Sequence, residues 1–388
     1  MIDINRTALA ETLSAMVRVP SINSSLVPGA EGEREIAEWI ADRLRATPGV
    51  DVEMQDAGGG RPNVIASVGH RNGRTLMLNG HMDTVGVAGM DDPFSGRIEN
   101  GRVYGRGSAD MKCAMAGAIV LLEELARRDD FPGTLVVTFV ADEEHSSIGT
   151  EAICREIERW KPDAALIIEP THHSILTAHK GFAWATITTQ GFAAHGSAWE
   201  IGVDAVAHMG RVLVALETYA GELVRREPHP IVGPPSMHAS LIRGGQELSS
   251  YPDACELEIE RRTIPGESEE SVRVELQSIL DRLASEDARF SATLEMGLFR
   301  EPFDISRDAE IVTILDRAVR EELGREPVYG GGAGWMDSAL LSAAGVPTAI
   351  FGPAGDGSHG LVEWADIDSL EVFVRTVARA AYAFCSAS

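Results

Sequence analysis

The alternation of short apolar segments with longer amphipathic segments constrains the fold of this chain more than any other feature. Each short segment is bounded by Gly, Asn or Pro, which is typical of strands. In the longer segments, apolar residues recur three or four positions apart, which is typical of helices. This alternation indicates an α/β layered domain with a largely parallel sheet. The predicted strands are Asn63–Val68, Thr75–Leu78, Thr134–Val140 and Ala164–Ile168, and the predicted helices are Asn5–Val19, Glu31–Leu44, Met115–Ala126 and Thr150–Trp160.

A second pattern begins after Gly181. Its order is strand, helix, strand, strand, helix, strand, which is typical of a ferredoxin-like α+β domain. Beyond Pro302 the α/β pattern resumes. We therefore predict an α/β domain formed by residues 1–180 and 298–388, with an inserted α+β domain at residues 181–297. The inserted segments are Ala183–Thr189, Val203–Leu223, Met237–Ile242, Cys255–Arg262, Glu269–Ala284 and Phe290–Gly297, and the later ones are Ala309–Glu322, Thr348–Phe351 and Ile367–Phe384.

The composition excludes several classes of partner. The chain has 34 Lys and Arg against 59 Asp and Glu, a formal net charge of -25. Such a surface repels phosphate backbones and anionic lipids, so we predict neither a nucleic-acid partner nor a membrane partner. No stretch approaches the roughly 18 apolar residues of a membrane-spanning helix. The N-terminus lacks signal-peptide features and the four cysteines form no CxxC pair, so we expect a cytoplasmic protein.

Side chains that can bind metals recur directly after the predicted strands, where ligands bind in α/β sheets. Taken singly, each has another interpretation, such as a hydrogen-bonded loop pair, a helix N-cap or a solvated acidic loop. Together they offer nitrogen and oxygen ligands from five separate loops. With one Asp bridging, they could hold two divalent metals, and such ligands without thiolate suit Zn²⁺, and also Co²⁺ or Mn²⁺. The residues are His81, Asp110, Glu144, Glu169 and His359.

Two further carboxylates, each close in sequence to a predicted ligand, are expected to have a role other than binding metal. Asp83 lies two positions after His81 and could orient its ring, as carboxylates often do for a ligating His. Glu143 precedes Glu144, and of such a pair one Glu can bind metal while the other accepts a proton from metal-bound water.

In these motifs the chain resembles the acetylornithine deacetylase, succinyl-diaminopimelate desuccinylase and aminoacylase-1 family of dinuclear zinc hydrolases. The resemblance implies a zinc-peptidase-like α/β catalytic domain with an inserted ferredoxin-like lid that also forms a homodimer. It also implies an enzyme that hydrolyses C–N amide bonds. The motifs that carry it are Gly80–Val85, Gly105–Lys112, Asp142–Glu144, Glu169–Thr171 and His359, with Gly191–Ser197 in the insertion.

The resemblance assigns the metal ligands one by one. His81 and Glu169 would bind one zinc ion, Glu144 and His359 the other, and Asp110 both.

It also assigns the residues around the metals. Asp83 would orient His81, and Glu143 would act as general base and later as acid. His195, from the lid, would polarise the scissile carbonyl, commonly in the site of the neighbouring subunit. A cis peptide bond is expected after Asp110.

Substrate contacts are expected at four further positions. Arg262 matches a lid Arg that often meets a substrate carboxylate, although it could instead pair with Glu260. Gly332 lies in a glycine-rich loop which, with Asp337, is expected near the substrate. Ser249 replaces an Asn that often holds the carboxylate end of the substrate, which argues against acetylornithine or succinyl-diaminopimelate as the substrate.

The leading hypothesis is a metal-dependent deacylase of an N-acyl amino acid or related compound, with a two-metal-activated water and Glu143 as base. The alternative is a dipeptidase or carboxypeptidase of the same family with the same mechanism. A metal-stabilised scaffold with a lapsed site is disfavoured because every ligand and Glu143 are present. A serine hydrolase is disfavoured because no Gly-x-Ser-x-Gly motif occurs.

Overall fold

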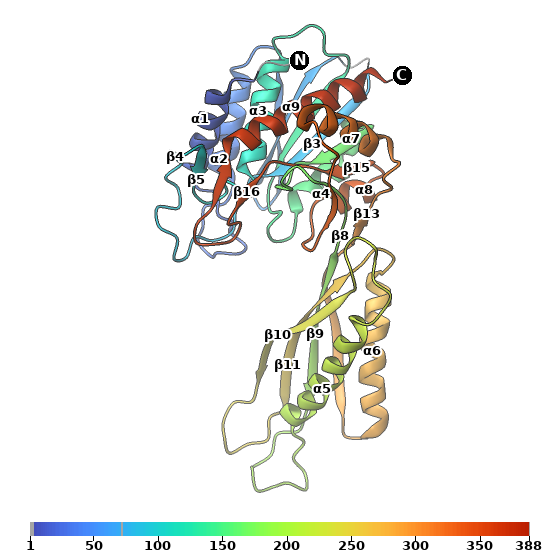
Figure 1. Ribbon diagram of the computed structural model, residues 1–388. Coiled ribbons are helices and arrows are strands. Elements are labelled where there is room, and N and C mark those ends of the chain that lie inside the picture. The colour runs from blue at the N-terminus through green and yellow to red at the C-terminus, as the bar shows by residue number, and fades with distance from the viewer. Residues whose placement is uncertain (1–3, 71–72, 388) are drawn as a thin grey trace. The chain divides into compact units, whose positions relative to one another are not determined.

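A computed structural model describes residues 4–70 and 73–387. The chain divides into two compact units. Unit 1 comprises Met1–Thr177, Ile305–Gly330 and Met336–Ser388, and unit 2 comprises Ala178–Asp304 and Gly331–Trp335. Figure 1 shows the order of the elements along the chain.

Three short segments depart from the predicted division. Residues 178–180, 298–304 and 331–335 were expected in the first domain but group with unit 2. Hydrogen bonds connect these segments. The carbonyl of Gly332 accepts the backbone N–H of Lys180 at 3.2 Å, and Trp335 Nε1 donates to the carbonyl of Glu301 at 3.0 Å.

The main sheet has the strand order β1-β2-β6-β3-β7-β15-β8-β13, and β14 pairs with β8. Its four central strands, β6, β3, β7 and β15, pair in parallel, whereas the pairs towards both edges are antiparallel. The strands are β1 (Asp51–Gly58), β2 (Arg61–Gly69), β3 (Thr75–His81), β6 (Thr134–Val140), β7 (Ala164–Ile167), β8 (Ile175–His179), β13 (Phe303–Asp304), β14 (Tyr329–Gly332) and β15 (Thr348–Ile350).

The prediction of a largely parallel sheet is therefore right for the centre and wrong for the edges. A tight turn through Gly59 and Gly60 joins β1 to β2, and a two-residue turn requires antiparallel strands. Sequence analysis missed β1 because its polar, largely exposed residues give no apolar run.

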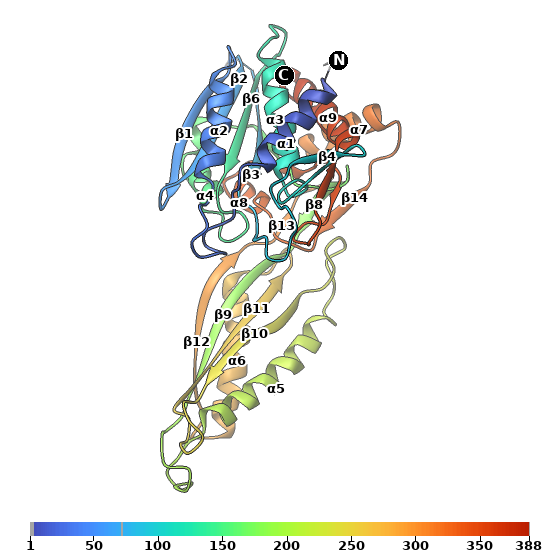
Figure 2. The ribbon, with the colours of Figure 1, turned by 90° about the vertical axis from the view of Figure 1, so that its left-hand side faces the viewer.

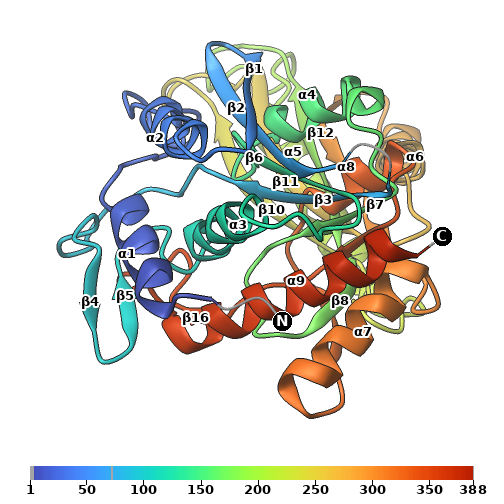
Figure 3. The same cartoon turned by 90° about the horizontal axis from the view of Figure 1, so that it is seen from above.

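Helices cover both faces of this sheet (Figure 3). Leu135, Val137 and Phe139 of β6 enter the core shared with α1, α2, α3, α7 and α9. The alternate residues Val136 and Val140 are also buried. The other face of the sheet carries α4 and α8 (Figure 3). Burial on both faces explains why the central strands read as continuous apolar runs. The helices are α1 (Arg6–Val17), α2 (Arg34–Arg45), α3 (Lys112–Leu125), α4 (Ile148–Arg155), η1 (Ile157–Arg159), α7 (Glu310–Leu323), α8 (Ser338–Ala343) and α9 (Ile367–Ser386).

A small sheet of order β16-β17-β5-β4 joins two distant loops of unit 1. Its central pair is antiparallel and aligns Trp364 with Tyr104. The loop before α3 and the loop before α9 are thereby held side by side. The strands are β4 (Arg97–Glu99), β5 (Arg102–Tyr104), β16 (Gly355–Asp356) and β17 (Trp364–Asp366).

Unit 2 is an antiparallel sheet of order β10-β11-β9-β12, with two helices packed on it (Figure 2). The order of elements and of strands is ferredoxin-like. Ala183, Ala185 and Ile187 alternate into a core shared with Val212 and Leu276 of the helices. No helix among the described residues has the length and apolar character needed to cross a membrane. The elements are β9 (Gly181–Gln190), α5 (Ala205–Leu223), β10 (Ser236–Gly244), β11 (Ala254–Thr263), α6 (Glu269–Glu286) and β12 (Ser291–Arg300).

Candidate metal centre

The carboxyl ends of the parallel strands bring the predicted ligands together. His81 is the last residue of β3, Glu144 follows β6, Glu169 follows β7 and His359 lies in the loop after β15. Parallel strands place these ends along one edge of the sheet, where their loops converge. Asp110, from the turn before α3, lies between them. The structure thus gathers all five into two groups that share Asp110.

Each group holds one imidazole and two carboxylates. In the first, His81 Nε2 lies 3.2 Å from Asp110 Oδ1 and 3.5 Å from Glu169 Oε1. In the second, His359 Nε2 lies 3.1 Å from Glu144 Oε2 and 3.6 Å from Asp110 Oδ2. Asp110 therefore turns one oxygen towards each group. The peptide bond between Asp110 and Met111 is cis, as the family resemblance implied.

Asp83 contacts the ring of His81 through its main-chain oxygen, whereas the sequence predicted a contact through its carboxylate. The Nδ1 of His81 lies 2.9 Å from the main-chain oxygen of Asp83 and 3.6 Å from its carboxylate. Because a carbonyl oxygen only accepts, Nδ1 carries the hydrogen and Nε2 faces the carboxylates of its group. The carboxylate of Asp83 instead accepts the backbone N–H groups of Glu143 and Glu144, each at 3.1 Å. Asp83 thus fixes the loop that carries Glu143 and Glu144 as well as the ring of His81.

Glu143 belongs to neither group but lies beside them. Its Oε2 is 3.9 Å from His81 Nε2, and its side chain is only 11% exposed. Burial raises the pKa of Glu143 well above its ordinary value, and the nearby charges of Glu169 and Asp337 raise it further against the effect of His81. A carboxylate whose pKa is raised in this way is a stronger base than an exposed one, which suits it to accept a proton.

The electrostatics of the two groups fit divalent cations. Burial, reinforced by Asp110, raises the pKa of Glu169 to about 8, and burial also raises the pKa of Glu144. Burial lowers the pKa of His81, but Glu169 and its other carboxylate neighbours outweigh it and raise the pKa well above the usual value. Glu144 Oε1 is buried without a hydrogen-bond partner among the described residues. Carboxylate oxygens and imidazole nitrogens of this kind are ligands of Zn²⁺, Co²⁺ and Mn²⁺.

Sequence analysis missed two buried residues that support the site. Asn23, in the loop after α1, donates its side-chain N–H groups to Asp83 at 2.7 Å and to Asp142 at 3.0 Å. Glu363, in the loop that also carries His359, accepts the backbone N–H of Asp110 at 3.0 Å. Neither residue lies in a motif that announces chemistry. The only sequence signal near Glu363 is its place in the segment between His359 and the predicted helix Ile367–Phe384.

Two of the other predicted residues lie on exposed loops of unit 2. His195 Nδ1 is 2.8 Å from the hydroxyl of Ser197. Ser249 accepts the backbone N–H of Gly196 through its carbonyl at 2.7 Å. Both side chains are exposed, so their expected contacts with substrate stay predictions.

The remaining substrate positions divide between the units. Arg262 Nε donates to Glu260 at 2.7 Å, which is the pairing that the sequence left open. Gly332 is the last residue of β14 and Asp337 directly precedes α8, so residues 333–336 form the loop between them, and the expected contact of both with substrate stays a prediction. Asp337 is buried and accepts the hydroxyl of Thr150 at 2.6 Å, and burial raises its pKa to about 6.

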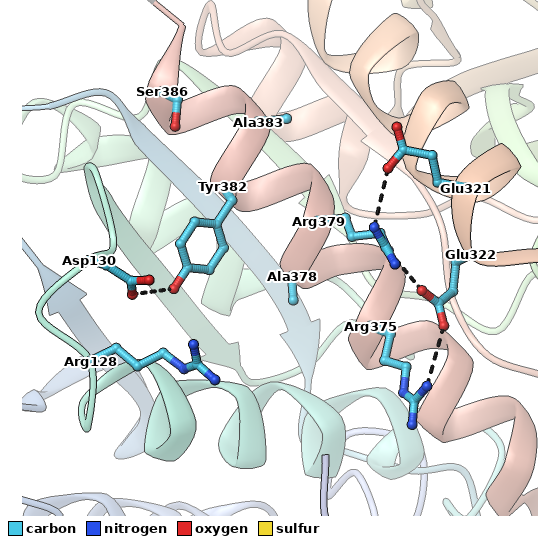
Figure 4. A pocket seen from close by; sticks show the side chains of 10 residues that line it. All are labelled: Arg128, Asp130, Glu321, Glu322, Arg375, Ala378, Arg379, Tyr382, Ala383 and Ser386. Carbon is cyan, nitrogen blue, oxygen red and sulfur yellow. Dashed lines mark hydrogen bonds and ion pairs between the residues drawn. The ribbon is translucent and has the colours of Figure 1, made fainter. Parts of the chain in front are cut away.

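A cavity of about 510 Å³ lies elsewhere in unit 1, beside α7 and α9 (Figure 4). None of the predicted site residues lines it. Its charged side chains pair with one another: Arg379 with Glu321 at 3.2 Å and with Glu322 at 2.8 Å. Tyr382 also donates to Asp130 at 2.9 Å. This internal pairing leaves the strand-end cluster as the stronger candidate for a functional site.

An α/β sheet with two imidazole–carboxylate groups at its strand ends defines the chain as a metal-dependent hydrolase by class. Residues 77–383 match the family model described as peptidase family M20/M25/M40, and the chain belongs to this family. Members of the family hydrolyse amide bonds, and the chain is an enzyme of this kind.

Similarity to individual relatives extends over almost the whole chain. An acetylornithine deacetylase from Myxococcus xanthus is 28% identical over 389 residues, covering 97% of this chain and 98% of the relative. A metallo-carboxypeptidase of the M20 family from Sulfolobus solfataricus has the same fold, with a TM-score of 0.80, 16% identity and coverage of 97% and 99%. A dinuclear metal-binding M20 peptidase from Bacillus subtilis has a TM-score of 0.73, 17% identity and coverage of 98% of each chain.

Proposed function

We propose that the protein is a metal-dependent deacylase that hydrolyses the amide of an N-acyl amino acid or a related compound. The observation that carries the proposal is a pair of imidazole–carboxylate groups that share Asp110. The buried carboxylate of Glu143 lies beside them and belongs to neither group. Similarity to acetylornithine deacetylases supports a deacylase over a peptidase. A dipeptidase or carboxypeptidase with the same mechanism is the alternative, and the substrate test below separates the two.

His81 and Glu169 would hold one cation, Glu144 and His359 the other, and Asp110 both. We propose Zn²⁺, with Co²⁺ or Mn²⁺ able to replace it, because the groups contain nitrogen and oxygen ligands without thiolate. When bound, two such cations supply an activated water and withdraw charge from the substrate carbonyl oxygen. The similar fold of a dinuclear metal-binding peptidase is consistent with two ions.

Glu143 would take a proton from the attacking water and return it to the leaving nitrogen. Burial raises its pKa, which makes the carboxylate a stronger base for the first transfer. The hydrogen bonds from the backbone of Glu143 and Glu144 to Asp83 hold this loop against the ring of His81. The side chain therefore needs no large rearrangement to reach its working position.

His195 would donate to the oxygen that becomes negatively charged in the transition state. We place it in the site of a neighbouring subunit, within a homodimer formed through unit 2. Such an interface would cover exposed apolar side chains on α5 and on the edge strand β10. They are Val206, Val214, Leu241 and Ile242. Light scattering should then give twice the chain mass of 41.6 kDa.

The cytoplasm is the proposed location. All four cysteines are free thiols, and three of them are buried. Free cysteines are ordinary in a reducing compartment.

A substrate panel tests the proposed reaction. Purified protein would be stripped with a chelator, reloaded with Zn²⁺, Co²⁺ or Mn²⁺, and given N-acetyl, N-succinyl and N-formyl amino acids beside a set of dipeptides. Release of the free amine is the readout. We expect turnover only after reloading, with the highest kcat/KM on an N-acyl amino acid. Higher values on dipeptides would favour the peptidase alternative, and no turnover by protein containing two metals would reject both.

A further inference from the structure

A buried ion pair lies behind the shared ligand Asp110. Glu363 is 1% exposed and Arg106 is 3% exposed. Glu363 Oε2 accepts from Arg106 Nη1 at 2.6 Å and from the backbone N–H of Gly107 at 3.1 Å. Its Oε1 accepts the backbone N–H groups of Ala109 at 2.9 Å and Asp110 at 3.0 Å. One carboxylate therefore collects four donors from a single turn.

These hydrogen bonds determine the path of the main chain at Asp110. A buried carboxylate is tolerated only where donors replace its water shell, and here three of the four are backbone N–H groups. The N–H of Asp110 itself is one of them. Because its main chain is fixed, the carboxylate of Asp110 can turn one oxygen to His81 and the other to His359.

The same ion pair fixes the loop of His359. Glu363 lies in that loop, and its carbonyl accepts the backbone N–H of Gly105 at 3.1 Å. Arg106 also donates to the carbonyl of Gly360, the residue after His359, at 2.9 Å. Arg106 and Glu363 therefore connect the loop that carries Asp110 with the loop that carries His359.

We propose that Glu363, with Arg106 as its counter-ion, is a positioning residue for the metal pair. It touches neither metal nor substrate and acts through Asp110 and His359. The inference rests on the proposed function, since it presumes that the two groups bind cations. It also predicts an asymmetry, because the second group depends on this ion pair through both Asp110 and His359, whereas the first depends on it through Asp110 alone.

Glu363→Gln tests the proposal with the smallest change of shape. The amide can keep one oxygen for Ala109 and Asp110, but its NH₂ group then faces the donors of Arg106 and Gly107. Calorimetric titration of metal-free protein with Zn²⁺ would measure both binding steps. Loss of such a supporting contact typically weakens metal binding by about 10- to 100-fold. We expect a loss of that size in one binding step, a smaller loss in the other, and an altered visible spectrum of the Co²⁺ form.

Glu123→Gln is the matched control. Glu123 lies near the other end of α3 and accepts two hydrogen bonds from Arg43, at 2.7 Å and 3.1 Å, in a partly buried pair. The substitution makes the same chemical change in the same unit. We expect both metal affinities and the Co²⁺ spectrum to stay as in the unsubstituted protein.

Glu363→Asp and Arg106→Lys provide second variants if Glu363→Gln does not fold. Asp keeps the charge with a shorter reach, so it should recover part of the lost affinity. Lys keeps the charge of Arg106 but not its several donors, so the two metal-binding steps should again lose affinity unequally. Unchanged affinities in the folded variants, or equal losses at both steps, would overturn the positioning role. If the unsubstituted protein binds no metal, the proposed function fails instead.

Discussion

The candidate residues of unit 1 and those of unit 2 are held in very different ways. In unit 1, His81 and Glu169 are buried, and each contacts other candidates of the same cluster. In unit 2, His195 and Ser249 are exposed and contact only residues a few positions away or in the neighbouring loop. The parallel strand ends of unit 1 locate several functional groups relative to one another. The loops of unit 2 leave the side chains of His195 and Ser249 exposed to solvent.

This difference separates two kinds of contribution to the proposed reaction. A cluster whose members raise or lower one another's pKa values is a candidate for proton transfer. The exposed imidazole of His195, which lies outside the cluster, can contribute only when another surface, such as a second subunit or a bound substrate, reaches it. Substitutions within the cluster of unit 1 should therefore abolish chemistry, whereas those of His195 or Ser249 in unit 2 should alter transition-state stabilisation or substrate affinity.

The largest effect is expected from Glu143→Gln. The amide cannot take the proton of the attacking water, so kcat should fall by roughly 10²- to 10⁴-fold, the usual scale for general-base loss. Because Glu143 belongs to neither metal group, elemental analysis should find the same metal content as in the unsubstituted protein.

Glu158→Gln makes the same change at an exposed position of unit 1 and should leave kcat unchanged. A Glu143→Gln protein with full metal content and near-normal kcat would remove Glu143 from the mechanism. Lost metal together with lost activity would point to a ligand instead.

The next effect is expected from His195→Ala. Removing one donor to a developing oxyanion lowers kcat by about 10²- to 10³-fold. Since the side chain is exposed, Tm and metal content should not change. This result would show that an exposed residue of unit 2 contributes to the transition state without being part of the cluster.

Mixing the two inactive proteins tests where His195 acts. In a mixed dimer of His195→Ala and Glu143→Gln chains, one site would receive an intact copy of each residue from different chains. Activity should return as subunits exchange, which native mass spectrometry can follow. Exchange without recovered activity would place His195 in its own chain or outside the reaction.

The sequence predicts the cluster better than it predicts what supports the cluster. His81, Glu144 and Glu169 follow apolar runs, and the rule that loops at the ends of parallel strands converge is enough to group them. Asn23 and Glu363 act by hydrogen bonds to a distant carboxylate or to backbone N–H groups, which leave no local pattern.

Other differences between the sequence-based predictions and the structure also concern contacts that leave no local pattern in the sequence. That Asp83 would meet His81 could be read from their spacing, but not that its main-chain oxygen would make the shorter contact. The pairing of Arg262 with Glu260 depends on rotamers, which the alternation of a strand does not set. The edge strand β1 carries too few buried residues to show a pattern.

A smaller effect is expected from Arg262→Ala. If this guanidinium meets a substrate carboxylate, its removal should raise KM for N-acyl amino acids by about tenfold, equivalent to roughly 1.4 kcal/mol, and leave kcat nearly unchanged. Glu260→Gln should act in the opposite direction, because it releases Arg262 from its present partner. Steady-state kinetics on an acid substrate and on its neutral amide would measure both. Equal KM changes on acid and amide would exclude a carboxylate contact.

The smallest expected effect is that of bound metal on thermal stability. It should depend on pH, because buried groups of unit 1 titrate. Without metal, burial raises the pKa of Glu169 to about 8 from 4.5, so between these values the native state holds a proton that the unfolded chain has released. Ionisation therefore opposes folding as pH rises, and the free energy of unfolding of metal-free protein falls. The raised pKa of His81 acts in the same direction, because the protonated ring loses its favourable contacts as it titrates.

Bound cations stabilise the ionised carboxylates and compete with protons for both residues. The difference in Tm between metal-loaded and chelated protein should thus widen from pH 5 to pH 8, by about 2–4 °C for each kcal/mol. Thermal scans with Zn²⁺ or with chelator would measure it, and Glu169→Gln should flatten the trend. A difference that stays constant with pH would mean that no metal binds at these carboxylates.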